Sequence, residues 1–237
     1  VLGGGGPVGV AWEAGLLAGL LDAGVDVRRA DYVQGTSAGS IVGSAVAMGA
    51  DLNLLAEAQR SLASVTPGAG GPPDLSKLMV LMMRFPPTGE PSLEQRKELG
   101  VLSLTSPAMP EEAFVAMIGG GLAPGDWPET FACTAVDAET GEFHVWRKAD
   151  GVPMARAVSS SCSVPGIFPP VMINGRRWMD GGMRSSISID QAAGCKRVLA
   201  VAVIPAAARA WLIPRFEAEA GAVRAAGGEM MMIAPDD

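Results

Sequence analysis

The sequence predicts an α/β protein with a parallel sheet, and three observations carry this prediction. A short apolar stretch at residues 1–2 runs through a glycine-rich loop into a helical pattern. A second short strand, at 32–34, leads directly into a helix of small residues. Residues 197–204 form an almost continuous apolar run, which is typical of a strand buried on both faces. Strands that alternate with helices in this way are typical of a parallel sheet.

Each element follows from a local pattern. Residues 10–23 carry apolar side chains on one helical face and end at Gly24, a residue that suits the position after a helix. Asn174 and Gly175 predict a type I′ turn between two short strands. In chain order, the patterns predict helices at 10–23, 38–49, 50–62, 111–118, 152–159, 187–193 and 214–226, and strands at 32–34, 130–137, 143–147, 171–173, 177–179, 197–204 and 229–233.

The composition changes between residues 66 and 92. Prolines and glycines bracket a methionine-rich run at 75–85, so we expect an insertion outside the sheet. This run fits either an ordinary packed helix or a mobile apolar flap over a site that accepts lipid. No interdomain linker is visible, so residues 1–237 are expected to form a single domain, with the insertion at about 66–92 as a candidate lid.

The overall composition limits the classes of function. With 49% hydrophobic and 18% charged residues, the 237-residue chain can bury a sizeable core. The formal charge of -7 and a pI near 4.8 argue against nucleic acid as a partner and against electrostatic docking on anionic membranes. No apolar run approaches the roughly 18 residues of a membrane span. The chain starts at Val1 without an initiator methionine, so the absence of a signal peptide is uninformative.

The cysteines and the other metal-binding residue types point to no cofactor. Cys133, Cys162 and Cys195 are widely spaced and form no C-x-x-C, which favours reduced thiols and a cytoplasmic location. No cluster with metal-ligand spacing is visible, so neither calcium nor zinc dependence is expected.

The stretch from residue 32 to residue 43 has the form of a nucleophile elbow. Ser37 lies between Gly35 and Gly39, in the pattern G-x-S-x-G, after a strand and before a helix. The glycines permit a sharp turn that exposes the serine hydroxyl at the helix N-terminus, where developing negative charge is stabilised. Ser37 is therefore the candidate nucleophile. A glycine-rich turn that only caps a helix is the alternative interpretation.

A serine nucleophile needs a neighbouring proton acceptor. His144, the only histidine, lies in the middle of a strand of a hairpin, where a histidine is more often structural. Asp180 is better placed, because a strand ends there and Gly181 and Gly182 leave space beside the carboxylate. An ordinary Asp-Gly turn is the alternative, and an aspartate base requires a raised pKa.

The loop at residues 4–9 fits two functions. Gly4, Gly6 and Gly9 match the dinucleotide pattern G-x-G-x-x-G, and Asp26 follows about 17 residues later. However, Asp26 comes before the second strand instead of at its end. The loop amides can equally point at an oxyanion on a carbonyl held by Ser37, with the Ala38 N–H as a partner donor.

Three ordered motifs resemble the patatin-like phospholipase family of lipid acyl hydrolases: the glycine-rich loop, Gly-Thr-Ser-Ala-Gly-Ser at 35–40 and Asp-Gly-Gly at 180–182. Residues 159–170 are similar to the family segment that leads to its aspartate. The resemblance implies a three-layer α/β/α sandwich with a mainly parallel central sheet, and a Ser37–Asp180 dyad without histidine. It also implies an oxyanion hole made by the amides of Gly4, Gly5 and Gly6. The family loop usually has Arg or Lys before its last glycine, where this chain has Val8.

These inferences converge on a serine hydrolase that cleaves carboxylic esters of lipids through an acyl-Ser37 intermediate, with Asp180 as general base. The expected type is a phospholipase A or lysophospholipase that meets its lipid substrate at a transient membrane or micelle contact. A soluble short-chain carboxylesterase or thioesterase is the alternative. A nucleotide-binding or non-catalytic interaction protein that uses residues 4–9 is a further one.

Overall fold

The computed structural model describes residues 1–63, 75–86, 88–123, 125–204 and 208–235. The helices are α1 (Gly6–Asp22), α2 (Ala38–Ala47), α3 (Leu52–Ala63), α4 (Ser76–Met82), α5 (Leu93–Thr105), α6 (Glu111–Gly120), α7 (Met154–Ser161) and α8 (Arg209–Ala225). The strands are β1 (Val33–Gly35), β2 (Phe131–Asp137), β3 (Phe143–Arg147), β4 (Val171–Ile173), β5 (Arg176–Asp180), β6 (Arg197–Val201) and β7 (Glu229–Ile233). Short 3-10 helices are η1 (Val27–Arg29), η2 (Lys148–Asp150), η3 (Gly181–Met183) and η4 (Ile189–Ala192).

The strands form an α/β structure with a mixed sheet. Five of them lie in one sheet, in the order β1-β2-β5-β4 with β3 also paired to β2, and β6 and β7 form a parallel pair. Leu2 makes parallel bridges to Gly35 and to Val201, and so joins the two groups of strands. Within the five-stranded sheet, β1–β2 is parallel and the β2–β3, β2–β5 and β4–β5 pairings are antiparallel.

The expectation of a mainly parallel sheet is therefore not confirmed. The physical reason is the two hairpins, because strands joined by a tight turn must run antiparallel. Both hairpins were predicted correctly, β2 with β3 and β4 with β5. Asn174 and Gly175 have φ of 52° and 77°, as the type I′ turn requires. The sequence did not reveal that both hairpins pair within the central sheet.

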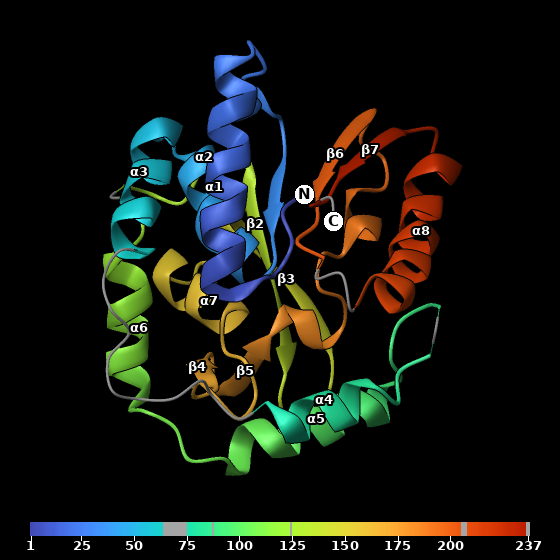
Figure 1. Cartoon of the computed structure of the whole chain (residues 1–237). Coiled ribbons are helices and arrows are strands. Elements are labelled where there is room, and N and C mark those ends of the chain that lie inside the picture. Colours follow the sequence, from blue (N-terminus) through green and yellow to red (C-terminus); the bar gives the residue numbers. More distant parts are fainter. Residues whose placement is uncertain (64–74, 87, 124, 205–207, 236–237) are drawn as a thin grey trace.

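Helices cover both faces of the strands, as the alternation along β6 demonstrates. Leu199 and Val201 pack into the cluster that includes side chains of α1, α2 and α7. Val198 and Ala200 point the other way, into the cluster with Phe216 and other side chains of α8. Figure 1 shows α1 and α8 on opposite sides of the strands, with α4 and α5 together at one end of the molecule.

Two differences from the predicted elements concern the surroundings of the site. The helix expected at 187–193 is only the short η4, and α5 was not predicted at all. A signal for α5 does exist in the sequence, because Ser92 and Gln95 form a capping box at its start. The methionine-rich run contains α4, outside the sheet as expected, whereas residues 66–74 and 87 of the insertion lie outside the described residues. No described helix is long and apolar enough to cross a bilayer.

Candidate active site

Ser37 occupies a strained corner between β1 and α2. The strand ends at Gly35 and the helix begins at Ala38, so only two residues make the turn. Ser37 has φ 53° and ψ −120°, in the region of positive φ that side chains rarely adopt. Such strain in a residue other than glycine persists only where surrounding contacts impose it, and it is concentrated at functional sites.

The flanking glycines are required by close backbone contacts. A Cβ on Gly35 would lie 2.2 Å from the carbonyl oxygen of Gly39, and a Cβ on Gly39 would lie 2.3 Å from the carbonyl oxygen of Leu2. Both distances are far below van der Waals contact. The glycine spacing around Ser37 thus allows the strand and the helix to approach each other at the corner.

The backbone of Ser37 is held on both sides by side chains. Its N–H donates to Ser161 Oγ over 3.0 Å, and its carbonyl accepts hydrogen bonds from Ser40 Oγ at 2.6 Å and Cys162 Sγ at 3.4 Å. Burial raises the pKa of the Cys162 thiol to about 12, so it remains a protonated donor. Sequence reasoning missed these supports, because Ser161 and Cys162 come from the distant end of α7.

Asp180 ends β5 and lies beside the serine. Its backbone pairs with Ala135 of β2, and only 2% of the residue is exposed. Oδ1 accepts the Gly182 N–H at 2.7 Å, and the Ser37 side chain lies near enough to the carboxyl group to lower its pKa. Burial raises the pKa of Asp180 from 3.8 to about 7, while the Gly182 N–H and the Ser37 side chain act in the opposite direction. The structure therefore brings together the two residues that the sequence selected.

Two threonines pack between the strands that carry this pair. Thr36 Oγ1 and Thr134 Oγ1 lie 2.7 Å apart, joining β1's end to β2. A Cβ on Gly181 would lie 2.1 Å from Thr134 Oγ1, so the residue after Asp180 has no space for a side chain. Packing against Thr134 consequently requires glycine at position 181, in addition to the turn that the Asp-Gly-Gly sequence forms.

The glycine loop reaches the serine, but not in the arrangement that the family resemblance implies. A Cβ on Gly4 would lie 3.3 Å from Ser37 Cβ, which places the loop against the corner. The Gly4 N–H, however, donates to the carbonyl oxygen of Ser186 at 2.6 Å. In this conformation the Gly4 N–H is already hydrogen-bonded. Contrary to the expectation, it is therefore not free to donate to an oxyanion.

Other amides at this corner remain available as donors. Gly5 precedes α1, Gly6 begins it and Ala38 begins α2, and such N–H groups have no acceptor within the helix. Within the described ranges, none of the three donates to another group. Gly9 lies opposite Ala38, where an added Cβ would approach the Ala38 Cβ to 3.1 Å. The starts of α1 and α2 are thus adjacent and offer positive helix ends.

The His144 ring packs against tryptophan side chains. The ring centroids of Trp146 and Trp178 lie 4.2 and 5.5 Å from its own, and Nε2 lies 3.5 Å from Asp150 Oδ1. None of these contacts among the described residues involves Ser37. The chain's histidine therefore takes part in an aromatic cluster formed by side chains of β3 and β5, as expected of a structural residue.

Asp26 is not placed to act as the ribose-binding acid of a dinucleotide site. Asp26 forms an ion pair with Arg28 at 2.8 Å and caps η1. It also follows α1, whose 17 residues span about 25 Å, so it lies far from the glycine loop at the helix start. Within the described part of the chain, no group of three or more His, Cys, Asp or Glu side chains has a metal-binding arrangement. The three cysteines are free.

Comparisons with known proteins agree with this arrangement of motifs. A family model described as patatin-like phospholipase matches residues 1–193, which include the glycine loop, Ser37 and Asp180. A search of curated proteins gave no match. Among solved structures, VipD from Legionella pneumophila is similar at 15% identity and a TM-score of 0.43, over 76% of this chain and 45% of VipD. This chain thus corresponds to less than half of VipD's length.

Proposed function

The chain belongs to the patatin-like phospholipase family, and from this premise we propose that it is a lipid acyl hydrolase that uses Ser37 and Asp180 as its catalytic pair. The observation that carries the proposal is the position of the Ser37 side chain beside the buried Asp180 carboxyl group, whose pKa it lowers. Members of the family are hydrolases of lipid esters.

The raised pKa of Asp180 supports its role as the base. A general base works best when its pKa lies near the working pH, and an ordinary aspartate is too acidic for this. Burial raises the pKa of Asp180 to about 7, so its carboxylate is populated at neutral pH and still accepts a proton readily. The dyad thereby does without the histidine that a serine nucleophile usually needs.

The proposed reaction has two steps. Ser37 Oγ attacks the ester carbonyl carbon while Asp180 accepts its proton, and the resulting tetrahedral oxyanion collapses as the C–O bond to the alcohol breaks. Asp180 returns the proton to the departing alkoxide, which leaves an acyl-Ser37 ester. Asp180 then takes a proton from water, whose oxygen attacks the acyl group, and the proton returns to Ser37 as the fatty acid is released. The amides of Gly5, Gly6 and Ala38 are the proposed oxyanion donors.

The α4–α5 region supports a lipid substrate. A groove of about 450 Å³ lies between the two helices, and its lining includes Val80 and Val101. The most exposed apolar side chains of this region are Met79, Val80, Met83 and Val101. Apolar side chains on adjacent helices favour contact with acyl chains or a lipid surface. We propose that residues 66–92 act as the lid of a single hydrolase domain, and that the substrate is a phospholipid or lysophospholipid.

The test is turnover of nitrophenyl esters with short and long acyl chains, in solution and in micelles. Ser37→Ala and Asp180→Asn should each lower kcat by at least about 1000-fold. Ser44→Ala is the matched control, since Ser44 lies in α2, the helix that follows Ser37, and its side chain donates only to the Ile41 carbonyl oxygen in the described structure. Near-normal turnover by either dyad variant would overturn the proposal. Preference for soluble short-chain esters over micelles would favour the carboxylesterase or thioesterase instead.

A further inference from the structure

The segment that follows Asp180 connects the proposed base to the glycine loop. It begins with η3, where the Gly182 N–H donates to the Asp180 carboxylate at 2.7 Å. Four residues later, the Ser186 carbonyl oxygen accepts the Gly4 N–H at 2.6 Å. A displacement of this segment would therefore move the base and the oxyanion loop together.

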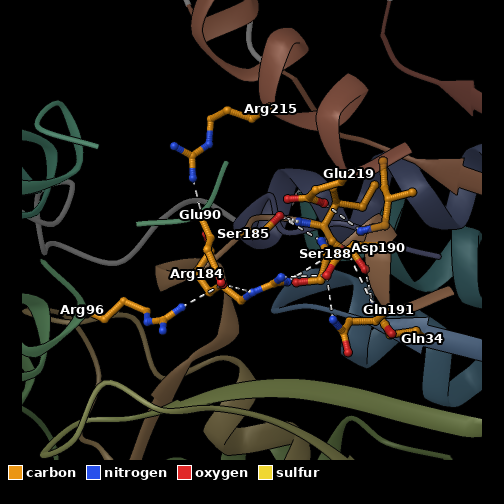
Figure 2. A network of polar contacts seen from close by, with 12 residues as sticks. Gln34, Glu90, Arg96, Arg184, Ser185, Ser188, Asp190, Gln191, Arg215 and Glu219 are labelled. Atoms are coloured by element: carbon orange, nitrogen blue, oxygen red, sulfur yellow. Dashed lines mark hydrogen bonds and ion pairs between the residues drawn. The ribbon is translucent and has the colours of Figure 1, made fainter. Parts of the chain in front are cut away.

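Arg184 lies midway between these two contacts, and its side chain is nearly buried. Its two terminal nitrogens bind the two carboxylate oxygens of Asp190, at 3.0 and 2.7 Å. Nε donates to Glu90 Oε2 at 2.7 Å, and the guanidinium lies over the Phe143 ring, 4.5 Å from its centroid. Figure 2 shows these contacts to Glu90 and Asp190.

The partners of Arg184 come from separate parts of the fold. Asp190 belongs to η4, Phe143 to β3, and Glu90 precedes α5. Glu90 also binds Arg96 at 3.0 Å. From α8, Arg215 donates to the carbonyl oxygens of Arg184, at 3.4 Å, and Pro86, at 2.8 Å. One residue thus links the segment to several surrounding elements at once.

The far end of the segment has its own attachments. Ser185 Oγ accepts the N–H groups of Ile187 and Ser188, and Gln34 of β1 donates to the Ser188 carbonyl oxygen at 2.9 Å. These bonds hold the chain after Ser186. Between Asp180 and Ser186, Arg184 is the residue whose side chain forms ion pairs with acids of other segments in the described structure.

We propose that Arg184 is a positioning residue that holds Asp180 and the glycine loop in register for the reaction. This inference rests on the proposed function, and it adds a residue outside the dyad and the loop. The ion pair with Asp190 contributes most to holding Arg184 in place. A planar guanidinium matches a carboxylate in two parallel bonds, and both side chains are largely buried. The Glu90 pair contributes less, since Glu90 is half exposed and its ion pair is screened by water.

The kinetic test compares Arg184→Met with Arg184→Lys. A misplacement of about 1 Å costs on the order of 100-fold in rate, so Arg184→Met should lower kcat by about 10- to 100-fold and change KM by less than about 3-fold. Lysine keeps the charge but lacks the fork, and should recover only part of kcat. Because Arg184→Met leaves Asp190 buried and unpaired, the double variant Arg184→Met/Asp190→Asn checks that lost folding is not the cause. It should fold and remain slow.

Arg156→Met is the matched control. Arg156 also binds two acids, Glu111 at 2.7 Å and Glu112, but it joins α7 to α6. Its removal should leave kcat unchanged. If Arg184→Met lowers kcat no more than Arg156→Met, or only in proportion to the loss of folded protein, the inference is overturned.

Hydrogen exchange separates this inference from the proposed function. In Arg184→Met, amide exchange at Gly4 and Gly182 should be at least about 10-fold faster, because the bonds to Ser186 and Asp180 loosen. In Arg156→Met, both rates should stay unchanged. This result is expected even if the wild-type protein hydrolyses no ester, in which case the proposed function fails while the link between the two parts of the site stands. Unchanged exchange in Arg184→Met would refute that link.

Discussion

Replacing Asp180 by asparagine should remove activity and yet make the protein more stable above neutral pH. The reason is the cost of ionising a buried carboxyl group. Burial raises the pKa of Asp180 from 3.8 to about 7, so between these values the folded protein binds a proton that the unfolded chain has lost. The free energy of unfolding therefore falls as pH rises across this window, and the loss is complete above about pH 7.

The size of this effect follows from the width of the window. A pKa difference of about three units corresponds to about 4 kcal/mol as an upper limit, since each unit is worth about 1.4 kcal/mol. Between pH 5 and pH 8, roughly 3 kcal/mol of this should be lost. Asparagine has a similar shape, can still accept the Gly182 N–H, and carries no titrating proton. Relative to Asp180→Asn, the wild-type protein should lose roughly 3 kcal/mol over this range.

Urea unfolding at pH 5 and pH 8 measures this difference directly. Burial also raises the pKa of Glu13 and Glu219, but both groups are present in both proteins and cancel in the comparison. Asp190→Asn is the control. Burial acts to raise the pKa of Asp190, but the ion pair with Arg184 holds this pKa below its usual value. The contribution of Asp190 to the free energy of unfolding therefore changes below this pH range. If the wild-type and Asp180→Asn proteins differ by the same amount at both pH values, the reasoning about a buried, neutral Asp180 is wrong.

Three further outcomes are expected. Because the base must be deprotonated, kcat/KM for a nitrophenyl ester should rise with pH to a plateau, with a midpoint near pH 7; a midpoint near 4 would contradict the raised pKa of Asp180. His144→Phe should retain at least about half of wild-type kcat, since the ring packs with tryptophans, whereas a loss beyond about 100-fold would make histidine the base. Gly35→Ala should lower the free energy of unfolding by about 3 kcal/mol or more, because the new Cβ would meet the Gly39 carbonyl oxygen. Gly15→Ala, at an open helical position, should instead raise the free energy of unfolding by up to about 1 kcal/mol. Chemical denaturation of both variants measures the difference.

The parts of the candidate site that depend on local residue spacing could be predicted from the sequence. The glycines around Ser37 fix a corner that only a short strand and a following helix can make, and both were found where expected. Asp180 was selected because it ends a strand before two glycines, a local pattern as well. Both signals lie within a few residues of the group that they identify.

The contacts that hold the site were not predictable, because they join distant parts of the chain. Ser161 is 124 residues from Ser37, and nothing local in either stretch specifies their hydrogen bond. The same holds for the Ser186 carbonyl oxygen that occupies the Gly4 amide. The mixed sheet has a similar origin, since local turns predicted each hairpin but not the strand beside which it would pair. Helix α5 is a different case, because its capping box at Ser92 was present in the sequence and was missed.

Labelling with a fluorophosphonate, followed by peptide mapping of the adduct, tests the central claim most directly. This reagent forms a stable bond with an activated serine oxygen. We expect one adduct, on Ser37, in the wild-type protein, and labelling at least about 100-fold slower in Asp180→Asn. An adduct on another serine, or equal labelling of Ser37 in both proteins, would contradict the claim that a buried aspartate activates this serine.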